Sequence, residues 1–89
     1  LRVVLPGEPD HHTAAIIREE VDRELDGSVK LLTLDMSGIT FMDSSGIGVV
    51  LGRYRRMSES GGKLRMGGMS IYAEKILRMA GVLALLERK

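Results

Sequence analysis

The sequence predicts a single α/β domain built on a parallel β-sheet whose strands are joined by helices. The chain has 89 residues, which is enough for one compact domain but not for two. Its 44% hydrophobic and 28% charged residues are typical of a globular protein and argue against disorder. Short apolar runs alternate with segments of helical period in the order β-α-β-α-β-α-β. This order favours parallel strands connected by right-handed crossovers.

The first strand is predicted at residues 1–5, before a turn that contains Pro6 and Pro9. In the segment that follows, apolar residues recur at helical spacing, namely Ala14, Ile17, Val21 and Leu25. We therefore expect a helix over residues 11–26, with Asp10 as its N-cap.

Residues 31–36 are apolar on both faces, which favours a central strand covered on both sides. A second helix is expected over residues 43–58, because an apolar stripe recurs at helical spacing at Ile47, Val50, Leu51 and Tyr54. Asp43 is expected to cap this helix by accepting a hydrogen bond from the Gly46 N–H. Three arginines near its end are expected to complement the helix dipole, with a docking patch for an acidic partner as the alternative: Arg53, Arg55 and Arg56.

The last third of the chain predicts two further strands and one helix. Residues 63–66 alternate between polar and apolar, as a strand with one polar face does. Ser70 is expected to cap a third helix that Gly81 ends. The apolar run at residues 83–86 is interpreted as a final strand.

Composition argues against several classes of function. Thirteen basic against twelve acidic residues and 3% aromatic residues offer little for direct nucleic-acid binding. The chain has no cysteine, so disulfides and cysteine metal sites are excluded. No apolar run approaches the roughly 18 residues of a membrane-spanning helix, so no membrane span is expected.

Residues 41–48 carry the strongest chemical signal in the sequence. Ser44 and Ser45 fall in the first turn of the second predicted helix, where the helix dipole and unpaired N–H groups favour a phosphate. The same residues could also be a polar cap with two incidental serines, because Ser and Asp are favoured at helix starts. Local chemistry alone leaves both interpretations open.

Catalysis and nucleotide binding are disfavoured. A serine nucleophile needs a neighbouring base, yet the two histidines, His11 and His12, belong to another helix, and a nucleophile-elbow pattern is absent. Adjacent histidines also point to different helix faces and cannot share a metal ion. The spacing of the glycines after Ser45 does not match a dinucleotide-binding loop, and we expect Gly48 and Gly52 to permit close approach of the sheet or a partner. We therefore expect a protein that is not an enzyme and holds no cofactor or metal.

Two segments carry a specific resemblance to a known family. Residues 7–14, Gly-Glu-Pro-Asp-His-His-Thr-Ala, and residues 41–54, which begin Phe-Met-Asp-Ser-Ser-Gly, resemble the STAS domain. Within that family they are most similar to the anti-sigma F factor antagonists of sporulating Gram-positive bacteria. The resemblance covers nearly the whole chain. It implies one STAS domain over residues 1–89, with a STAS-like fold in which helices pack on a central, largely parallel sheet.

The resemblance implies an anti-anti-sigma factor, a cytoplasmic regulator of transcription. In that family the unphosphorylated protein binds an anti-sigma factor that is also a serine kinase, and this releases the sigma factor. The kinase phosphorylates the serine that matches Ser44, and a PP2C-type phosphatase reverses the modification. The docking surface around that serine maps to Asp43, Ser45, Gly46, Ile47 and Gly48, with Glu8 and Asp10 in a nearby loop. Glu8 and Asp10 could meet a basic kinase side chain or serve only as turn and cap residues.

The chain departs from the family pattern in ways that bear on its partners. Pro9 replaces the usual Leu, which removes a backbone donor and is expected to shorten the first strand. The family's opening strand and closing helix are not found, and their loss would make a homodimer plausible. One rival interpretation is another STAS role, as a stress-signalling scaffold or a transporter accessory subunit. The other is a small nucleotide-binding or hydrolytic protein.

Overall fold

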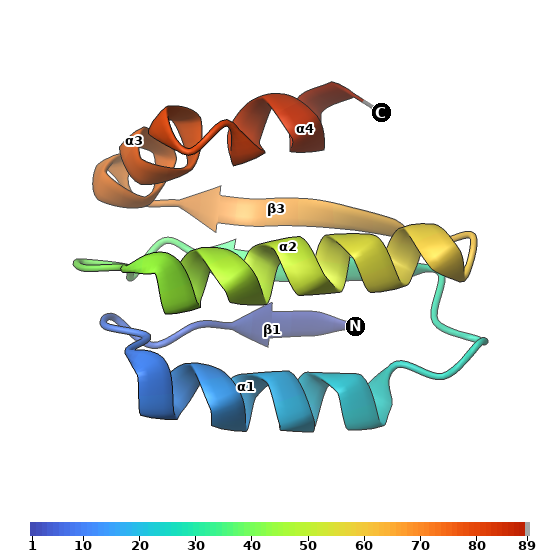
Figure 1. Ribbon diagram of the computed structural model, residues 1–89. Coiled ribbons are helices and arrows are strands. Elements are labelled where there is room, and N and C mark those ends of the chain that lie inside the picture. The colour runs from blue at the N-terminus through green and yellow to red at the C-terminus, as the bar shows by residue number, and fades with distance from the viewer. Residues whose placement is uncertain (89) are drawn as a thin grey trace.

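The computed structural model describes residues 1–88, which form a three-stranded parallel sheet and four helices (Figure 1). Strand β2 lies between β1 and β3, and both neighbours pair with it in parallel. The α/β class and the parallel sheet predicted from the sequence are therefore confirmed. In chain order the elements are β1 (Arg2–Val4), α1 (His11–Glu24), β2 (Leu31–Met36), α2 (Ser44–Glu59), β3 (Lys63–Met69), α3 (Ile71–Met79) and α4 (Val82–Arg88).

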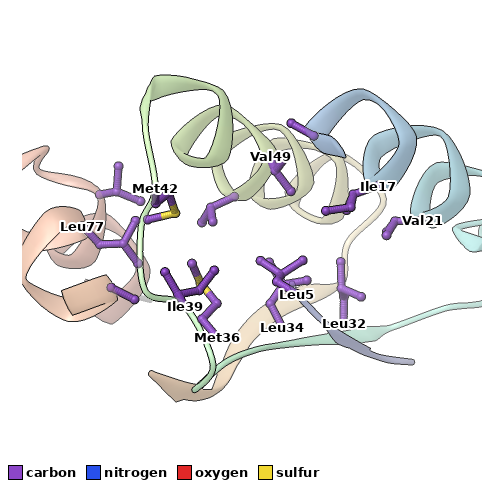
Figure 2. Close-up of a cluster of buried hydrophobic side chains, with 14 of the residues drawn as sticks. Leu5, Ile17, Val21, Leu32, Leu34, Met36, Ile39, Met42, Val49 and Leu77 are labelled. Carbon is purple, nitrogen blue, oxygen red and sulfur yellow. The ribbon is translucent and has the colours of Figure 1, made fainter. Parts of the chain in front are cut away.

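The hydrophobic core lies between one face of the sheet and the helices α1 and α2, and it extends to buried residues of α3 and α4 such as Leu77 (Figure 2). From β2, the side chains of Leu32, Leu34 and Met36 are fully buried. Apolar residues of the two helices close over them, among them Ile17 and Val49. This arrangement fixes α1 and α2 side by side above the sheet, with their N-termini at the same edge (Figure 1).

The opposite face of the sheet is open in the described part of the chain. Val4, Leu31 and Arg65 are exposed on it. The expectation that residues 31–36 are covered on both sides is wrong for this face, where Leu31 is exposed and only Thr33, at the middle of β2, is buried. The Thr33 methyl group and the Arg2 guanidinium fill the space beside Gly67. A Cβ added to Gly67 would lie 2.7 Å from the methyl group and 2.8 Å from the guanidinium. Close packing of side chains across the sheet, rather than a helix, therefore shields this position.

The helix boundaries follow the predicted caps. Asp10 Oδ1 accepts a hydrogen bond of 2.8 Å from the Thr13 N–H, and Ser70 Oγ accepts one of 3.0 Å from the Ala73 N–H. Gly61 and Gly81 follow the C-caps of α2 and α3 with φ near +79°, a conformation that glycine adopts without steric cost.

The predicted final strand at residues 83–86 is wrong, because this segment belongs to helix α4. A short apolar run does not by itself distinguish a buried strand from a buried helix. Leu83 and Leu86, three residues apart, share one side of α4 and line an apolar groove beside Leu64 and Met66 of β3. The order in the described residues is therefore β-α-β-α-β-α-α.

Candidate functional site

The two loops that carry the predicted site residues meet at the carboxyl edge of the sheet. Because the strands are parallel, the β1–α1 loop and the β2–α2 loop leave the sheet on the same side (Figure 1). The Gly7 carbonyl accepts hydrogen bonds from the backbone N–H groups of Thr40, at 2.8 Å, and Phe41, at 3.2 Å. These bonds join the two loops and so fix the position of the α1 N-terminus relative to that of α2.

Asp43 caps helix α2 as predicted. Its Oδ1 accepts a hydrogen bond of 2.9 Å from the Ser45 N–H and a longer one of 3.4 Å from the Gly46 N–H. The Asp43 carbonyl accepts from the Ile47 N–H at 3.2 Å, which starts the helical hydrogen-bond series. Asp43 therefore fixes the backbone on which the two serines stand.

The two serines differ sharply in their surroundings. Ser44 is exposed at the first position of α2, and its hydroxyl makes no hydrogen bond to the described residues. Ser45 is half-buried, and its Oγ lies 3.4 Å from Nδ1 of His11, the first residue of α1. Ser44 is thus the more exposed of the two serines.

The contact between His11 and Ser45 was missed by the sequence analysis, which placed the histidines on a separate helix. The signal that could have found it is topological, because helices that follow parallel strands begin at the same edge of the sheet. A serine nucleophile needs a base within about 2.6–3.2 Å that a third group orients. His11 is exposed and has no other side-chain partner in residues 1–88, so no third group there orients its ring. This pair does not have the geometry of a hydrolytic dyad.

Gly46 is buried and serves packing at the start of α2. A Cβ at this position would overlap Cγ of Met42 and would lie 3.3 Å from Cγ of Pro9. Gly46 was predicted to contact a partner, but it is buried and offers little exposed surface. Pro9, noted before only as a departure from the family pattern, is fully buried in this contact and joins the two loops.

The other predicted residues of α2 are more accessible. Ile47 is half-buried against the core, and Gly48 is exposed. An added Cβ on Gly48 or Gly52 would meet nothing within 4 Å, so neither glycine is needed for close approach to the sheet. The expectation of close approach to the sheet is therefore wrong for both.

The edge around Ser44 is acidic. Glu8 and Asp10 are exposed, Asp43 is partly exposed, and the loop segments 5–10 and 37–43 contain no lysine or arginine. The hydrogen bond from the Thr13 N–H, with a smaller contribution from His12, lowers the pKa of Asp10 below its usual value. Asp10 is therefore ionised at neutral pH while it caps α1.

An apolar surface borders the same edge. Phe41, three residues before Ser44, is half exposed and stacks on Tyr72 of α3 with ring centroids 6.4 Å apart. Ile71, the first residue of α3, is 88% exposed. The exposed serine thus lies between acidic side chains on the β1–α1 side and apolar side chains on the α3 side.

These features define a small parallel α/β domain whose candidate site is the exposed, capped start of a helix rather than a side-chain cluster of catalytic geometry. The chain belongs to the STAS domain family, whose sequence profile matches residues 1–88. None of the helices in those residues is both long and apolar enough to span a membrane.

Individual relatives are similar over most of the chain. The anti-sigma F factor antagonist of Paenibacillus polymyxa is 35% identical over 83 residues, which cover 92% of this chain and 71% of that protein. The anti-sigma F factor antagonist of Lysinibacillus sphaericus is 34% identical over 77 residues, 85% of this chain and 66% of that protein. A solved structure of the anti-sigma factor antagonist SpoIIAA in its unphosphorylated form superposes with a TM-score of 0.77 at 31% identity, covering 90% of this chain and 71% of that one.

Proposed function

We propose that this STAS domain is an anti-sigma factor antagonist whose binding is switched off by phosphorylation of Ser44. The observation that carries the proposal is the exposed Ser44 hydroxyl at the first position of α2, directly after the capping Asp43. The similarity to anti-sigma F factor antagonists supports it, as does the likeness to SpoIIAA in its unphosphorylated form. In its unphosphorylated state the domain binds an anti-sigma factor in the cytoplasm and so releases a sigma factor for transcription.

The partner is an anti-sigma factor that is itself a serine kinase. Phosphoryl transfer needs a nucleotide, Mg²⁺ and a group that accepts the hydroxyl proton, and the kinase supplies all three. This domain supplies the acceptor, Ser44. A PP2C-type phosphatase removes the phosphate and restores binding.

The docking surface consists of the accessible residues around Ser44. At the start of α2 these are the N-cap Asp43, then Ile47 and Gly48, with the exposed part of Ser45. The exposed carboxylates of Glu8 and Asp10 give the surface a negative charge, which favours a kinase surface with basic side chains. Phe41 and Ile71 add apolar area that a partner can bury.

Phosphorylation acts at this interface and leaves the fold intact. A phosphate adds about −1.5 to −2 charges at neutral pH. At the N-terminus of α2 this charge is favourable to the helix. The phosphate is also a bulky group next to carboxylates. A partner that docks over Ser44 therefore meets a steric conflict and an altered charge, and the complex is weakened.

The decisive experiment is incubation of the purified domain with a sporulation-type anti-sigma factor kinase and ATP, followed by intact mass measurement and peptide mapping. We expect one added phosphate, on Ser44, and weaker binding to the kinase afterwards. Ser44→Ala should take no phosphate and stay bound, whereas Ser45→Ala should still be phosphorylated on Ser44. The proposal fails if the wild-type domain takes no phosphate and also forms no complex with the kinase in ADP.

That negative result would favour the second candidate, another STAS role as a scaffold in a stress-signalling complex or as a transporter accessory subunit. The chain is also similar to anti-sigma-B factor antagonists, such as that of Bacillus subtilis at 26% identity over 85 residues. This similarity supports a general regulatory role. Neighbouring genes discriminate the two, because a kinase and a sigma factor support the antagonist role and transporter genes support the alternative.

A further inference from the structure

Two adjacent serines share the first turn of α2, and their hydroxyl groups have the same intrinsic chemistry. Their environments differ, because the Ser44 side chain is exposed whereas Ser45 is half-buried with Oγ 3.4 Å from His11 Nδ1. A kinase that docks over this helix start would bring its nucleotide close to both hydroxyls. Some feature of the substrate must therefore direct the phosphate to one of them.

We propose that His11 is a specificity-determining residue that confines phosphorylation to Ser44 by holding the Ser45 hydroxyl. The proposal rests on the proposed function, in which a kinase modifies this turn. It extends that function by assigning a role to a residue of α1, a helix that carries neither serine.

The chemistry of the transfer explains why a held hydroxyl reacts poorly. The serine oxygen must attack the γ-phosphorus of ATP, so that a new O–P bond forms as the bond from that phosphorus to ADP breaks. The hydroxyl proton passes to a base of the kinase. A Ser45 hydroxyl paired with His11 must first leave its partner and rotate outward, whereas Ser44 needs no such step.

Hydrogen bonds fix the backbone on both sides of the contact. On one side, the Ser45 N–H donates to Asp43 Oδ1 at 2.9 Å, which locks the first turn of α2. On the other side, the Asp10 carboxylate caps α1 directly before His11. The bonds from the Thr40 and Phe41 N–H groups to the Gly7 carbonyl join the two loops, so the contact does not depend on a mobile segment.

The contact can persist in either protonation state of His11. A neutral ring with a bare Nδ1 accepts the Ser45 O–H, and a protonated ring donates its Nδ1–H to Ser45 Oγ. The ionisable groups nearest in the chain are Glu8, Asp10 and His12 beside His11, and Asp43 beside Ser45. The contact therefore does not require a particular charge on the ring.

The test compares early phosphorylation of the wild-type domain, His11→Ala, His12→Ala and His11→Asn by a sporulation-type anti-sigma factor kinase with ATP. Peptide mapping measures the ratio of phosphate on Ser45 to phosphate on Ser44. We expect almost all phosphate on Ser44 in the wild type. In His11→Ala the ratio should rise roughly three- to tenfold, which is the usual effect of losing one hydrogen bond. His12→Ala should match the wild type, and His11→Asn should lie between, because its amide can also bond a hydroxyl.

The ratio separates this role from a general effect on docking, since a weakened complex slows both sites together and leaves the ratio unchanged. An unchanged ratio in His11→Ala, with Ser44 still modified, overturns the role of His11 and leaves the proposed function standing. Phosphate mainly on Ser45 in the wild type also overturns it. Absence of any phosphate in the wild type overturns the proposed function and this inference with it. A melting curve for each variant confirms that the compared proteins are folded.

Discussion

Arg53 of α2 and Asp22 of α1 form a buried ion pair that joins the two helices flanking the candidate site. Arg53 Nε lies 3.0 Å from Asp22 Oδ1, and the Arg53 Nη2 group donates to Oδ2 at 3.2 Å. The Arg53 side chain is only 7% exposed. Burial lowers the pKa of Arg53 and the nearby Asp22 carboxylate opposes this, so the guanidinium stays charged at neutral pH. Arg53 was expected to complement the dipole of α2, but it lies before the last turn, whose basic residue is Arg56, and it pairs with Asp22 instead.

Removal of Asp22 should destabilise the domain, because it leaves the buried Arg53 charge without its partner. We expect Asp22→Ala to lower the free energy of unfolding by about 2 kcal/mol, less than for a fully buried pair because Asp22 is partly exposed. The matched control is Glu74→Ala, which breaks the exposed Arg78–Glu74 pair of 2.8 Å within α3. That change should cost at most about 0.5 kcal/mol. Urea unfolding measures the loss in both variants. Equal losses would contradict the conclusion that the Asp22–Arg53 pair matters more to stability than the exposed pair.

Two glycines of α2 should respond in opposite ways to alanine. Gly46→Ala forces a methyl group against Met42 and Pro9, both buried, and we expect a loss of about 1–3 kcal/mol. Gly48→Ala meets nothing within 4 Å, so the better helix propensity of alanine should stabilise the domain by about 0.5–1 kcal/mol. Thermal unfolding of the two variants decides this. If Gly48→Ala is the more damaging change, the packing at the start of α2 has been misread.

Sequence patterns predicted the local features of this fold better than its long-range contacts. The caps at Asp10, Asp43 and Ser70 were predictable because each depends on residues no more than three positions away. The pairing of Asp22 with Arg53 and the contact of His11 with Ser45 each span more than thirty residues. Such contacts depend on how helices lie on the sheet, which periodicity does not fix.

Acid should weaken the domain in part through Asp35 at the end of β2. The Ser37 hydroxyl at 2.7 Å and the Ser37 N–H at 3.0 Å donate to its Oδ1, and Arg2 lies beside its other oxygen. The Ser37 hydroxyl first, then the Ser37 N–H and Arg2, lower the pKa of Asp35. Because this pKa is lower in the folded than in the unfolded state, the contribution is present above about pH 4 and is lost as the pH falls through the folded value.

The variant Asp35→Asn tests this dependence. Its urea midpoint should fall less between pH 7 and pH 3 than that of the wild type. Some fall should remain, because the pKa values of Asp10 and Asp26 are also lowered in the fold. Ser58→Ala, at an exposed position of α2, serves as the control and should follow the wild-type curve. An identical pH response in Asp35→Asn and the wild type would remove Asp35 from the explanation.

A negative charge at Ser44 should leave the fold intact and still abolish partner binding. Ser44 stands at the first position of α2, where the helix dipole favours an anion, whereas Ser58 stands in the last turn, where it does not. We expect Ser44→Asp to leave the free energy of unfolding within about 0.5 kcal/mol of the wild-type value, with any change being a slight increase. Ser58→Asp should lower the free energy of unfolding by about 0.3–1 kcal/mol. Calorimetry on both variants measures these differences.

Binding should rank the same two variants in the reverse order. Ser44→Asp should lose affinity for the anti-sigma factor kinase because the charge lies on the docking surface, whereas Ser58→Asp, nearly the full length of α2 away, should bind as the wild type does. A drop in melting temperature of Ser44→Asp together with lost binding would mean that the switch acts by unfolding the domain. Lost binding with an unchanged melting temperature would locate the switch at the interface, where the exposure of Ser44 and its place in the first turn of α2 make it effective.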